Sequence, residues 1–190
     1  MYRTAMPRER DSLATRSPAR KPSRSPRRRE PNRWGGRLVP VKIAQATVDD
    51  VAGLARLLWL DTHHEEPELR SVDAFAAELA HWWAARQDSH YAFVARLGGP
   101  TMVGMAWVAL VARVPRPGAT TRLCADIQSV FVLPEQRGEG IGSALVERAS
   151  AHATQLGAHR VTVHSGRRAV PLYERLGFES SRRLLQRPPD

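Results

Sequence analysis

The sequence predicts an α/β domain in which strands and helices alternate from about residue 38 onwards. Residues 127–133 have the nearly continuous apolar pattern of a buried strand, and from Ile141 apolar residues recur at helical spacing. Between these two segments lies a turn with glycine at every second position, namely Gly138, Gly140 and Gly142. Around this unit, the order of expected elements is strand, two helices, three strands, helix, strand, helix, strand.

The elements before the central unit follow from hydrophobic periodicity and from helix start and stop signals. Thr47 with Asp50 three residues later has the pattern of a capping box, and helical periodicity follows from Val51. The polar segment 61–67 ends in proline and ends this helix. The further expected elements are a strand at 41–44, a second helix at 71–86, and strands at 91–97 and 102–114.

The elements after the glycine-rich turn follow in the same way. The helix predicted over 140–156 is followed by Gly157 at a C-cap position. Pro171 is compatible with a helix only in its first turn, so within 168–176 the last helix should begin near 169 or 170. Strands are expected at 161–164 and 178–185, the second as a strand or a hairpin.

The positive charge of the chain is concentrated in its N-terminal part. The 190 residues carry a net charge of +10, and residues 1–37 hold eleven Arg and one Lys against three acidic residues. The remaining residues hold 17 basic and 16 acidic side chains, so they are nearly neutral. Residues 1–37 are also rich in proline and serine and contain little to bury. We therefore predict a disordered tail at 1–37 and a folded domain at 38–190.

Two interpretations of the tail stay open. The arginine-rich run at 24–29 could tether nucleic acid or another acidic partner. The tail could instead be merely solvated, or lie outside the natural reading frame, and we favour this because no aromatic residues interleave the arginines. We expect no nucleic-acid binding by the folded domain. Because Cys124 is the single cysteine and no apolar run could span a membrane, we expect a cytoplasmic protein.

The strand, glycine-rich turn and helix start within residues 125–143 are typical of an anion-binding unit. The first amides of a helix have no intrahelical partner, and the helix dipole adds partial positive charge there. Glycine allows the main chain to approach an anion closely, because no Cβ intervenes. The turn lacks the Gly-Lys-Ser/Thr of a Walker loop and the spacing of the dinucleotide fingerprint.

Two motifs resemble those of one enzyme family. Residues 137–142 read Arg-Gly-Glu-Gly-Ile-Gly, which is similar to the Arg-x-x-Gly-x-Gly acyl-CoA loop of the GNAT superfamily of N-acetyltransferases. Residues 172–178 read Leu-Tyr-Glu-Arg-Leu-Gly-Phe and resemble the C-terminal motif of that family. Both motifs occur in the family order, with a helix and a strand between them. The resemblance covers about 41–186.

The resemblance implies a fold and a co-substrate. GNAT domains have a mixed, twisted sheet of six to seven strands, splayed beside the central strand and flanked by about four helices. The backbone of Val130, Phe131 and Val132 would pair with the pantetheine arm of acetyl-CoA, with the Val132 amide directed at the thioester carbonyl. The turn and helix start would bind the pyrophosphate through Arg137, Gly138, Glu139, Gly140, Ile141, Gly142 and Ser143.

Two side chains are candidate catalytic groups by family analogy. Tyr173 aligns with the tyrosine that donates a hydrogen bond to the departing sulfur, and the alternative is an aromatic residue packed under the sheet. Asp126, at the start of the central strand, lies where some relatives carry the general base; it could equally pair with an arginine. His164 is a weaker candidate for the base. Gly166 replaces a family asparagine that binds the pantetheine arm, so that contact is lost or moves to Ser165 or backbone.

The loop between the first two helices often lines the acceptor pocket in this family. Here it contains His63, His64, Glu65 and Glu66. We expect no metal site, because adjacent residues do not converge on one ion without a further ligand.

We expect acetyl transfer from acetyl-CoA to a primary amine by direct attack, with a small molecule or a peptide as the acceptor. One alternative is a catalytically silent module that binds acyl-CoA as a sensor, which the presence of Tyr173 disfavours. The other is nucleic-acid tethering through the tail. A homodimer is compatible with the sequence.

Overall fold

The structure is built around one mixed sheet. It is a computed structural model that describes residues 40–181, 184, 185 and 187, so the predicted tail at 1–37 lies outside the described residues. The strands are β1 (Val41–Gln45), β2 (His90–Leu97), β3 (Met102–Ala112), β4 (Leu123–Val132) and β5 (Ala158–Val163), side by side in that order. Neighbouring strands from β1 to β4 are antiparallel, and β5 is parallel to β4.

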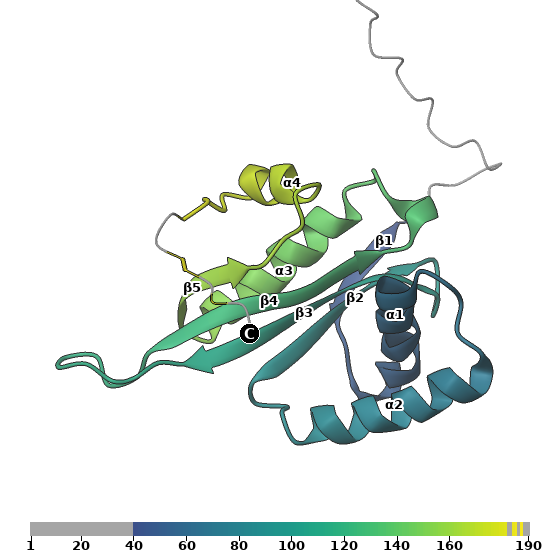
Figure 1. Cartoon of the computed structure of the whole chain (residues 1–190), viewed down its shortest axis with the longest axis horizontal. Helices are drawn as coiled ribbons and strands as arrows, with labels where there is room; N and C mark the ends of the chain where they lie inside the picture. Colours follow the sequence, from purple (N-terminus) through teal and green to yellow (C-terminus); the bar gives the residue numbers. More distant parts are fainter. Residues whose placement is uncertain (1–39, 182–183, 186, 188–190) are drawn as a thin grey trace, which may run out of the picture. The chain divides into compact units, whose positions relative to one another are not determined.

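Four helices cover the two faces of the sheet. They are α1 (Val51–His63), α2 (Leu69–Ala84), α3 (Ile141–Gln155) and α4 (Val170–Arg175). Figure 1 shows α1 and α2 on one side of the sheet and α3 and α4 on the other. Before α1, the Asp50 carboxylate accepts a hydrogen bond from the Thr47 amide at 3.0 Å, as the capping-box pattern predicts. The helix ends where His64 adopts the left-handed conformation, with φ of 61°.

The hydrophobic core lies on both sides of the sheet. Leu54 and Leu57 of α1, Phe93 and Met105 of the sheet, and Leu145 of α3 are all inaccessible to solvent. Within the described part of the chain, no charged or polar residue falls in the buried class. Charged groups that do chemistry must therefore lie at the rims of the layers, where water or a ligand reaches them.

The predicted mixed α/β fold is confirmed, with differences at several elements. α1 extends through Asp61 to His63, and β5 begins at Ala158 rather than at 161. β4 begins at Leu123 rather than at 127, because it pairs with β3 as far as Ala112. Asp126 therefore lies within this strand, not at its start. The described residues contain five strands instead of six to seven: residues 178–181, 184 and 185 belong to none. Leu184 and Leu185 are exposed, so no burial stabilises a strand there.

Candidate functional site

The last two strands of the sheet, β4 and β5, separate part-way along their length. The parallel pairing of β4 with β5 ends at Ile127 opposite Val163. β4 continues to Val132, paired in this stretch with β3 alone. The outer edge of residues 128–132 is thus a strand edge that no other strand covers within the described residues. An edge of this kind can accept an extended ligand as an added strand.

The hydrogen bonds of β4 indicate which backbone groups face this open edge. The Leu133 amide donates to the Val103 carbonyl of the β3 side at 2.9 Å. Because backbone groups alternate in direction along an antiparallel strand, those of Phe131 also face β3, and those of Val130 and Val132 face away from it. The Val132 carbonyl accepts a hydrogen bond from Nε of Arg137 at 2.9 Å, which agrees with that direction.

The glycine-rich turn brings the start of α3 beside the same edge. Gly138 and Gly140 have φ of 89° and 79°, in the left-handed region that favours glycine. The first intrahelical bond runs from the Ala144 amide to the Gly140 carbonyl at 3.0 Å, so the amides of residues 141–143 precede it. A Cβ on Gly142 would lie 3.9 Å from a Val132 methyl group. The helix start and the open edge are therefore in contact.

Side chains of the turn divide between the core and solvent. Ile141 is buried, so it offers only its backbone amide to a ligand. Glu139 is exposed, and Ser143 is half-buried. The guanidinium of Arg137 lies over the Phe131 ring, 5.7 Å from its centroid. All predicted cofactor-binding residues thus lie at one end of β4.

Tyr173 lies on α4, next to this region. Pro171 occupies the first turn of that helix, as expected. The tyrosine is 9% exposed, and its ring packs edge-to-face against Phe178 with centroids 5.4 Å apart. Burial raises the pKa of the Tyr173 phenol, so the hydroxyl keeps its proton at neutral pH. The side chain lines a cleft of about 1340 Å³ between α3, α4 and β5.

Asp126 borders the same cleft, and its partner is a threonine. The Thr162 hydroxyl on β5 lies 3.1 Å from the Asp126 carboxylate and 3.0 Å from the Ala125 carbonyl. No ion pair to an arginine is formed by Asp126 among the described residues, so the alternative of a structural salt bridge is not observed. A single hydroxyl partner leaves most of the carboxylate's acceptor capacity available.

A β-bulge determines which side chains share a face of β4. Trp107 of β3 pairs with Ser129, but the next residue, Val108, pairs with Ile127, so Gln128 is the extra residue. The bulge places Asp126 and Ser129 on one face, although their spacing of three residues would otherwise put them on opposite faces. Trp107 packs against Trp83 of α2, with ring centroids 5.1 Å apart, so this is the α1–α2 side of the sheet.

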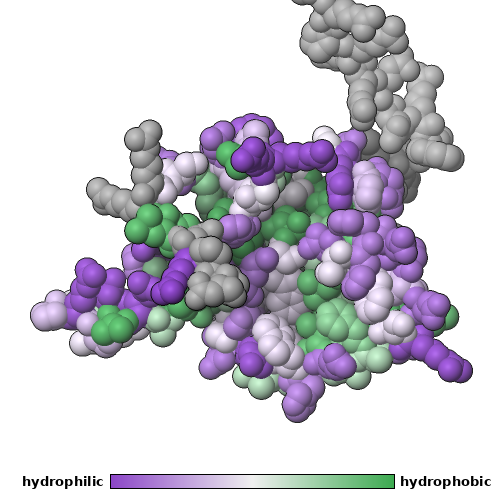
Figure 2. All heavy atoms as spheres, viewed as in Figure 1, coloured by the Kyte–Doolittle hydropathy of each residue, from purple (hydrophilic) through white to green (hydrophobic). Residues whose placement is uncertain are grey.

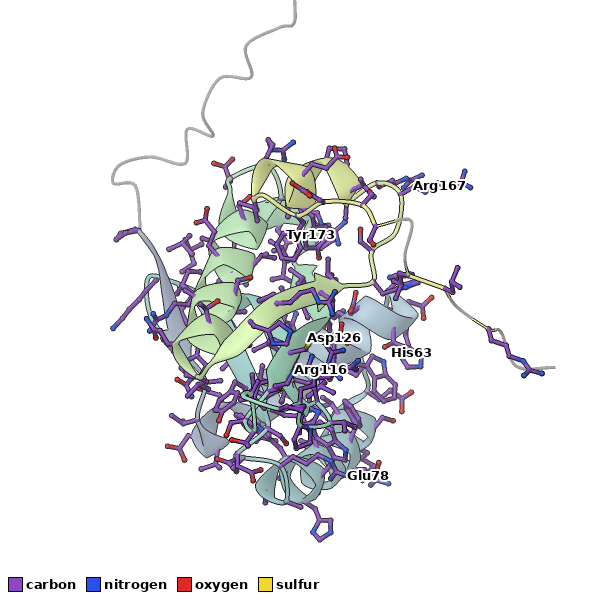
Figure 3. The ribbon with its side chains drawn as sticks, turned by 90° about the vertical axis from the view of Figure 1, so that its left-hand side faces the viewer. His63, Glu78, Arg116, Asp126, Arg167 and Tyr173 are labelled. Atoms are coloured by element: carbon purple, nitrogen blue, oxygen red, sulfur yellow. The ribbon has the colours of Figure 1, made fainter. Side chains whose placement is uncertain are left out.

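The two predicted catalytic side chains therefore approach the cleft from different sides. Figure 3 shows Tyr173 beneath α4 and Asp126 on the opposite side of β5, towards Arg116. Figure 2 shows apolar side chains gathered in the middle of one face of the molecule, between α4 and the sheet, with hydrophilic groups around them. A ligand in the cleft could meet a hydroxyl donor on one side and a carboxylate on the other.

Several of the remaining candidates have local partners. His63 stacks on Trp59 with ring centroids 4.5 Å apart, and Glu66 forms an ion pair with Arg56. The carbonyl of Gly166 accepts the Ser165 hydroxyl at 3.0 Å. Among the described residues, no three His, Cys, Asp or Glu side chains are grouped to hold a metal ion. No helix in that part of the chain is both long and apolar enough to cross a membrane.

Comparison with known proteins identifies the family. Residues 41–178 match the family described as acetyltransferase (GNAT). The chain belongs to this family. It is 31% identical over 104 residues to an uncharacterised N-acetyltransferase of Methanocaldococcus jannaschii, and 31% identical over 85 residues to a glucosamine 6-phosphate N-acetyltransferase of Trypanosoma brucei brucei. These matches cover 51% and 45% of this chain and 42% and 56% of the relatives, so the chain spans about half their length.

Solved structures share the GNAT fold over most of this chain. A Trypanosoma brucei acetyltransferase has a TM-score of 0.63 at 23% identity, covering 79% of this chain and 100% of that one. A predicted acetyltransferase from Clostridium acetobutylicum, solved with acetyl-CoA, has a TM-score of 0.62 at 18% identity, covering 78% and 96%. At these identities, the likeness shows the fold and not the acceptor.

Sequence reasoning missed two polar residues of this GNAT domain. Asp61 is in the last turn of α1, and its carboxylate accepts a hydrogen bond from the Ser129 hydroxyl at 3.1 Å. Asp61 stood at the edge of a polar segment, which is typical of a solvated loop. Ser129 gave no signal, because the bulge that sets its direction has no marker in the sequence. A cysteine contact was also missed: the Cys124 sulfur lies 3.7 Å from Nε2 of His159.

Proposed function

We propose that this chain is an N-acetyltransferase that moves an acetyl group from acetyl-CoA to a primary amine by direct attack. One observation carries the proposal: the open edge of β4, with the backbone groups of Val130 and Val132 directed outwards, meets the glycine-rich start of α3. A strand edge suits the amides of a pantetheine arm, and unpaired helix-start amides suit a pyrophosphate.

The groups at this end of β4 fit acetyl-CoA in charge and in shape. Arg137 supplies a positive charge at the Val132 carbonyl, at the end of β4 that the glycine-rich turn follows. Gly138 and Gly140 have open space where a Cβ would stand, so the main chain is approachable there. We propose that Gly138, Glu139, Gly140, Ile141, Gly142 and Ser143 bind the pyrophosphate mainly through main-chain amides.

Acetyl-CoA supplies an activated thioester, so the protein needs no covalent nucleophile. The Val132 amide, on the open edge, is suited to donate a hydrogen bond to a carbonyl oxygen that gains negative charge. The Tyr173 hydroxyl is protonated at neutral pH and can donate to a departing sulfur. Asp126 is our candidate for the group that accepts the proton of the attacking amine, and Thr162 orients its carboxylate.

The acceptor is proposed only as a primary amine, because two of the curated relatives are named for different molecules. One is named for glucosamine 6-phosphate, and a third, 27% identical over 119 residues, is a mycothiol acetyltransferase of Propionibacterium freudenreichii. The proposed catalytic domain is 38–190.

Steady-state release of CoA thiol from acetyl-CoA, measured for the full chain with a panel of amines, tests this proposal. We expect thiol release that depends on the amine and a product of the mass of the acetylated amine. Tight binding of acetyl-CoA without thiol release on any amine would favour the silent acyl-CoA-binding module. A chain that does not bind acetyl-CoA would refute the assigned site.

A further inference from the structure

Asp61 lies beside the point where the edge of β4 opens. Its carboxylate accepts a hydrogen bond from Ser129 at 3.1 Å, and Ser129 directly precedes Val130, whose backbone groups face the open edge. Asp126, in contrast, lies where β4 is still paired with β5, opposite Thr162. Of Asp61 and Asp126, Asp61 is therefore the one attached next to the open segment.

Asp61 has no cationic partner within the described residues. The ion pairs there join Arg56 to Glu66 and Arg96 to Asp50. A half-buried carboxylate loses part of its hydration, and one hydroxyl partner replaces only a fraction of it. The position therefore favours a cation that arrives from outside the protein.

A buried donor lies next to the same pair. Trp107 is directly opposite Ser129 in the β3–β4 register, and it is 4% exposed. Its indole Nε1 is buried and has no hydrogen-bond partner in the described part of the chain. Buried indole N–H groups usually have a partner, and this donor would meet a water or an acceptor atom of a ligand, not an ammonium group.

Resting on the proposed function, we propose that Asp61 binds the ammonium group of the acceptor and holds it beside the open edge of β4. The acceptor class that follows is a cationic amine, such as an alkyl diamine or a lysine-like side chain. An amino sugar phosphate, the substrate class named for one relative, would bring negative charge towards Asp61 and Asp126 and is disfavoured. Asp61 would position the acceptor, and Asp126 stays the candidate proton acceptor.

The first test is a kinetic comparison of matched carboxylate variants of the full chain. The probes are 1,4-diaminobutane, lysine amide and glucosamine 6-phosphate, each with saturating acetyl-CoA. We expect Asp61→Asn to raise KM for the cationic probes at least tenfold with little change in kcat, and Ser129→Ala to act in the same direction but less. Asp49→Asn, an exposed carboxylate before the opposite end of α1, is the control and should leave KM unchanged.

A binding measurement keeps the proposal falsifiable if turnover is slow. Calorimetric titration of the cationic probes into the protein with CoA should give binding that weakens at least tenfold in Asp61→Asn. The proposal is overturned by a KM within twofold of wild type in that variant, by higher kcat/KM on glucosamine 6-phosphate than on the cations, or by no binding and no turnover of either cation. If the protein still binds acetyl-CoA in these cases, the proposed function is not affected. If the wild-type protein does not bind acetyl-CoA, the proposed function itself is refuted.

Discussion

Nε of Arg137 donates a hydrogen bond to the carbonyl oxygen of Val132 at 2.9 Å. This contact joins the glycine-rich turn to the last residue of β4, so one side chain connects the two halves of the proposed acetyl-CoA site. The guanidinium also lies over the Phe131 ring, which fixes its orientation further. The turn and the open edge are thus held in a defined relation before any ligand binds.

Replacement of Arg137 by alanine should weaken acetyl-CoA binding about tenfold or more, because it removes both the link to Val132 and a positive charge near the pyrophosphate. Calorimetric titration measures the affinity. Arg148→Ala, on the exposed surface of α3, is the control and should bind as the wild type does. Equal acetyl-CoA affinity in Arg137→Ala and the control would show that Arg137 does not contribute to binding.

Gly140→Ala should lower both stability and acetyl-CoA affinity. Its φ of 79° disfavours any side chain, which costs about 1–2 kcal/mol. Gly118 is a matched control, because it has φ of 78° and equally open space around its Cβ position. Thermal unfolding should show similar losses for Gly118→Ala and Gly140→Ala, while acetyl-CoA affinity falls only in the second. An affinity loss of the same size in both variants would show that strain alone, not the ligand, explains it.

Tyr173→Phe should lower kcat by about tenfold to a hundredfold and leave the acetyl-CoA affinity unchanged, if the hydroxyl acts on the departing sulfur. The ring and its packing on Phe178 stay in place, so the fold is preserved. Single-turnover kinetics separate the chemical step from product release. Unchanged turnover in Tyr173→Phe would indicate that Tyr173 has only a structural role in the core.

The fold was predictable because its local signals agree with one another. The capping-box pattern at Thr47 and Asp50, the position of Pro171 and the glycine after α3 each mark a helix end that the structure contains. The prediction of a strand at 178–185 was wrong within the described residues. An apolar pair such as Leu184 and Leu185 predicts burial, but nothing in the sequence says whether a neighbouring layer covers it.

Unfolding free energy should fall as pH drops from about 7 to 5, partly because of His152. Burial, and secondly the charge of Arg148, lower the pKa of this imidazole, which packs edge-to-face on Tyr91. Below the unfolded-state pKa of about 6.5, the unfolded chain binds a proton that the folded chain binds less readily, so acid favours unfolding. Denaturant titration at several pH values measures the unfolding free energy. In His152→Gln, this free energy should depend less steeply on pH than in the wild type.

The exposed His81 on α2 supplies the control for that experiment, because among the described residues it makes no comparable contact with an aromatic ring. His81→Gln should keep the wild-type pH slope. A slope that is equally steep in His152→Gln would show that His152 does not contribute to the acid sensitivity.

Removal of residues 1–37 should leave acetyl-CoA affinity and amine-dependent turnover within about twofold of the full chain. The folded domain is nearly neutral, and the proposed site draws no residue from the tail. Filter binding of DNA or RNA at several salt concentrations tests the alternative role. Binding that weakens steeply with salt and disappears on truncation would assign nucleic-acid tethering to the tail.

The geometry of the candidate site was predictable where it depends on a local main-chain motif, and not where it depends on side chains that are distant in the sequence. Gly138, Gly140 and Arg137 form a local motif, so the sequence alone located the turn. The Asp61–Ser129 hydrogen bond joins residues 68 positions apart across a bulge at Gln128, and no local pattern encodes it. The partner of Asp126 was likewise left open, since a carboxylate in a strand gives no sign whether threonine or arginine will face it.

The most direct test of the proposed site is an amide NMR titration of the isotope-labelled full chain with acetyl-CoA. The open edge and the helix start predict large shifts for the amides of Val130, Val132 and residues 141–143, with smaller shifts on β1 and β2. Shifts that cluster away from the end of β4, or no shifts at millimolar ligand, would contradict the assignment of acetyl-CoA to this edge.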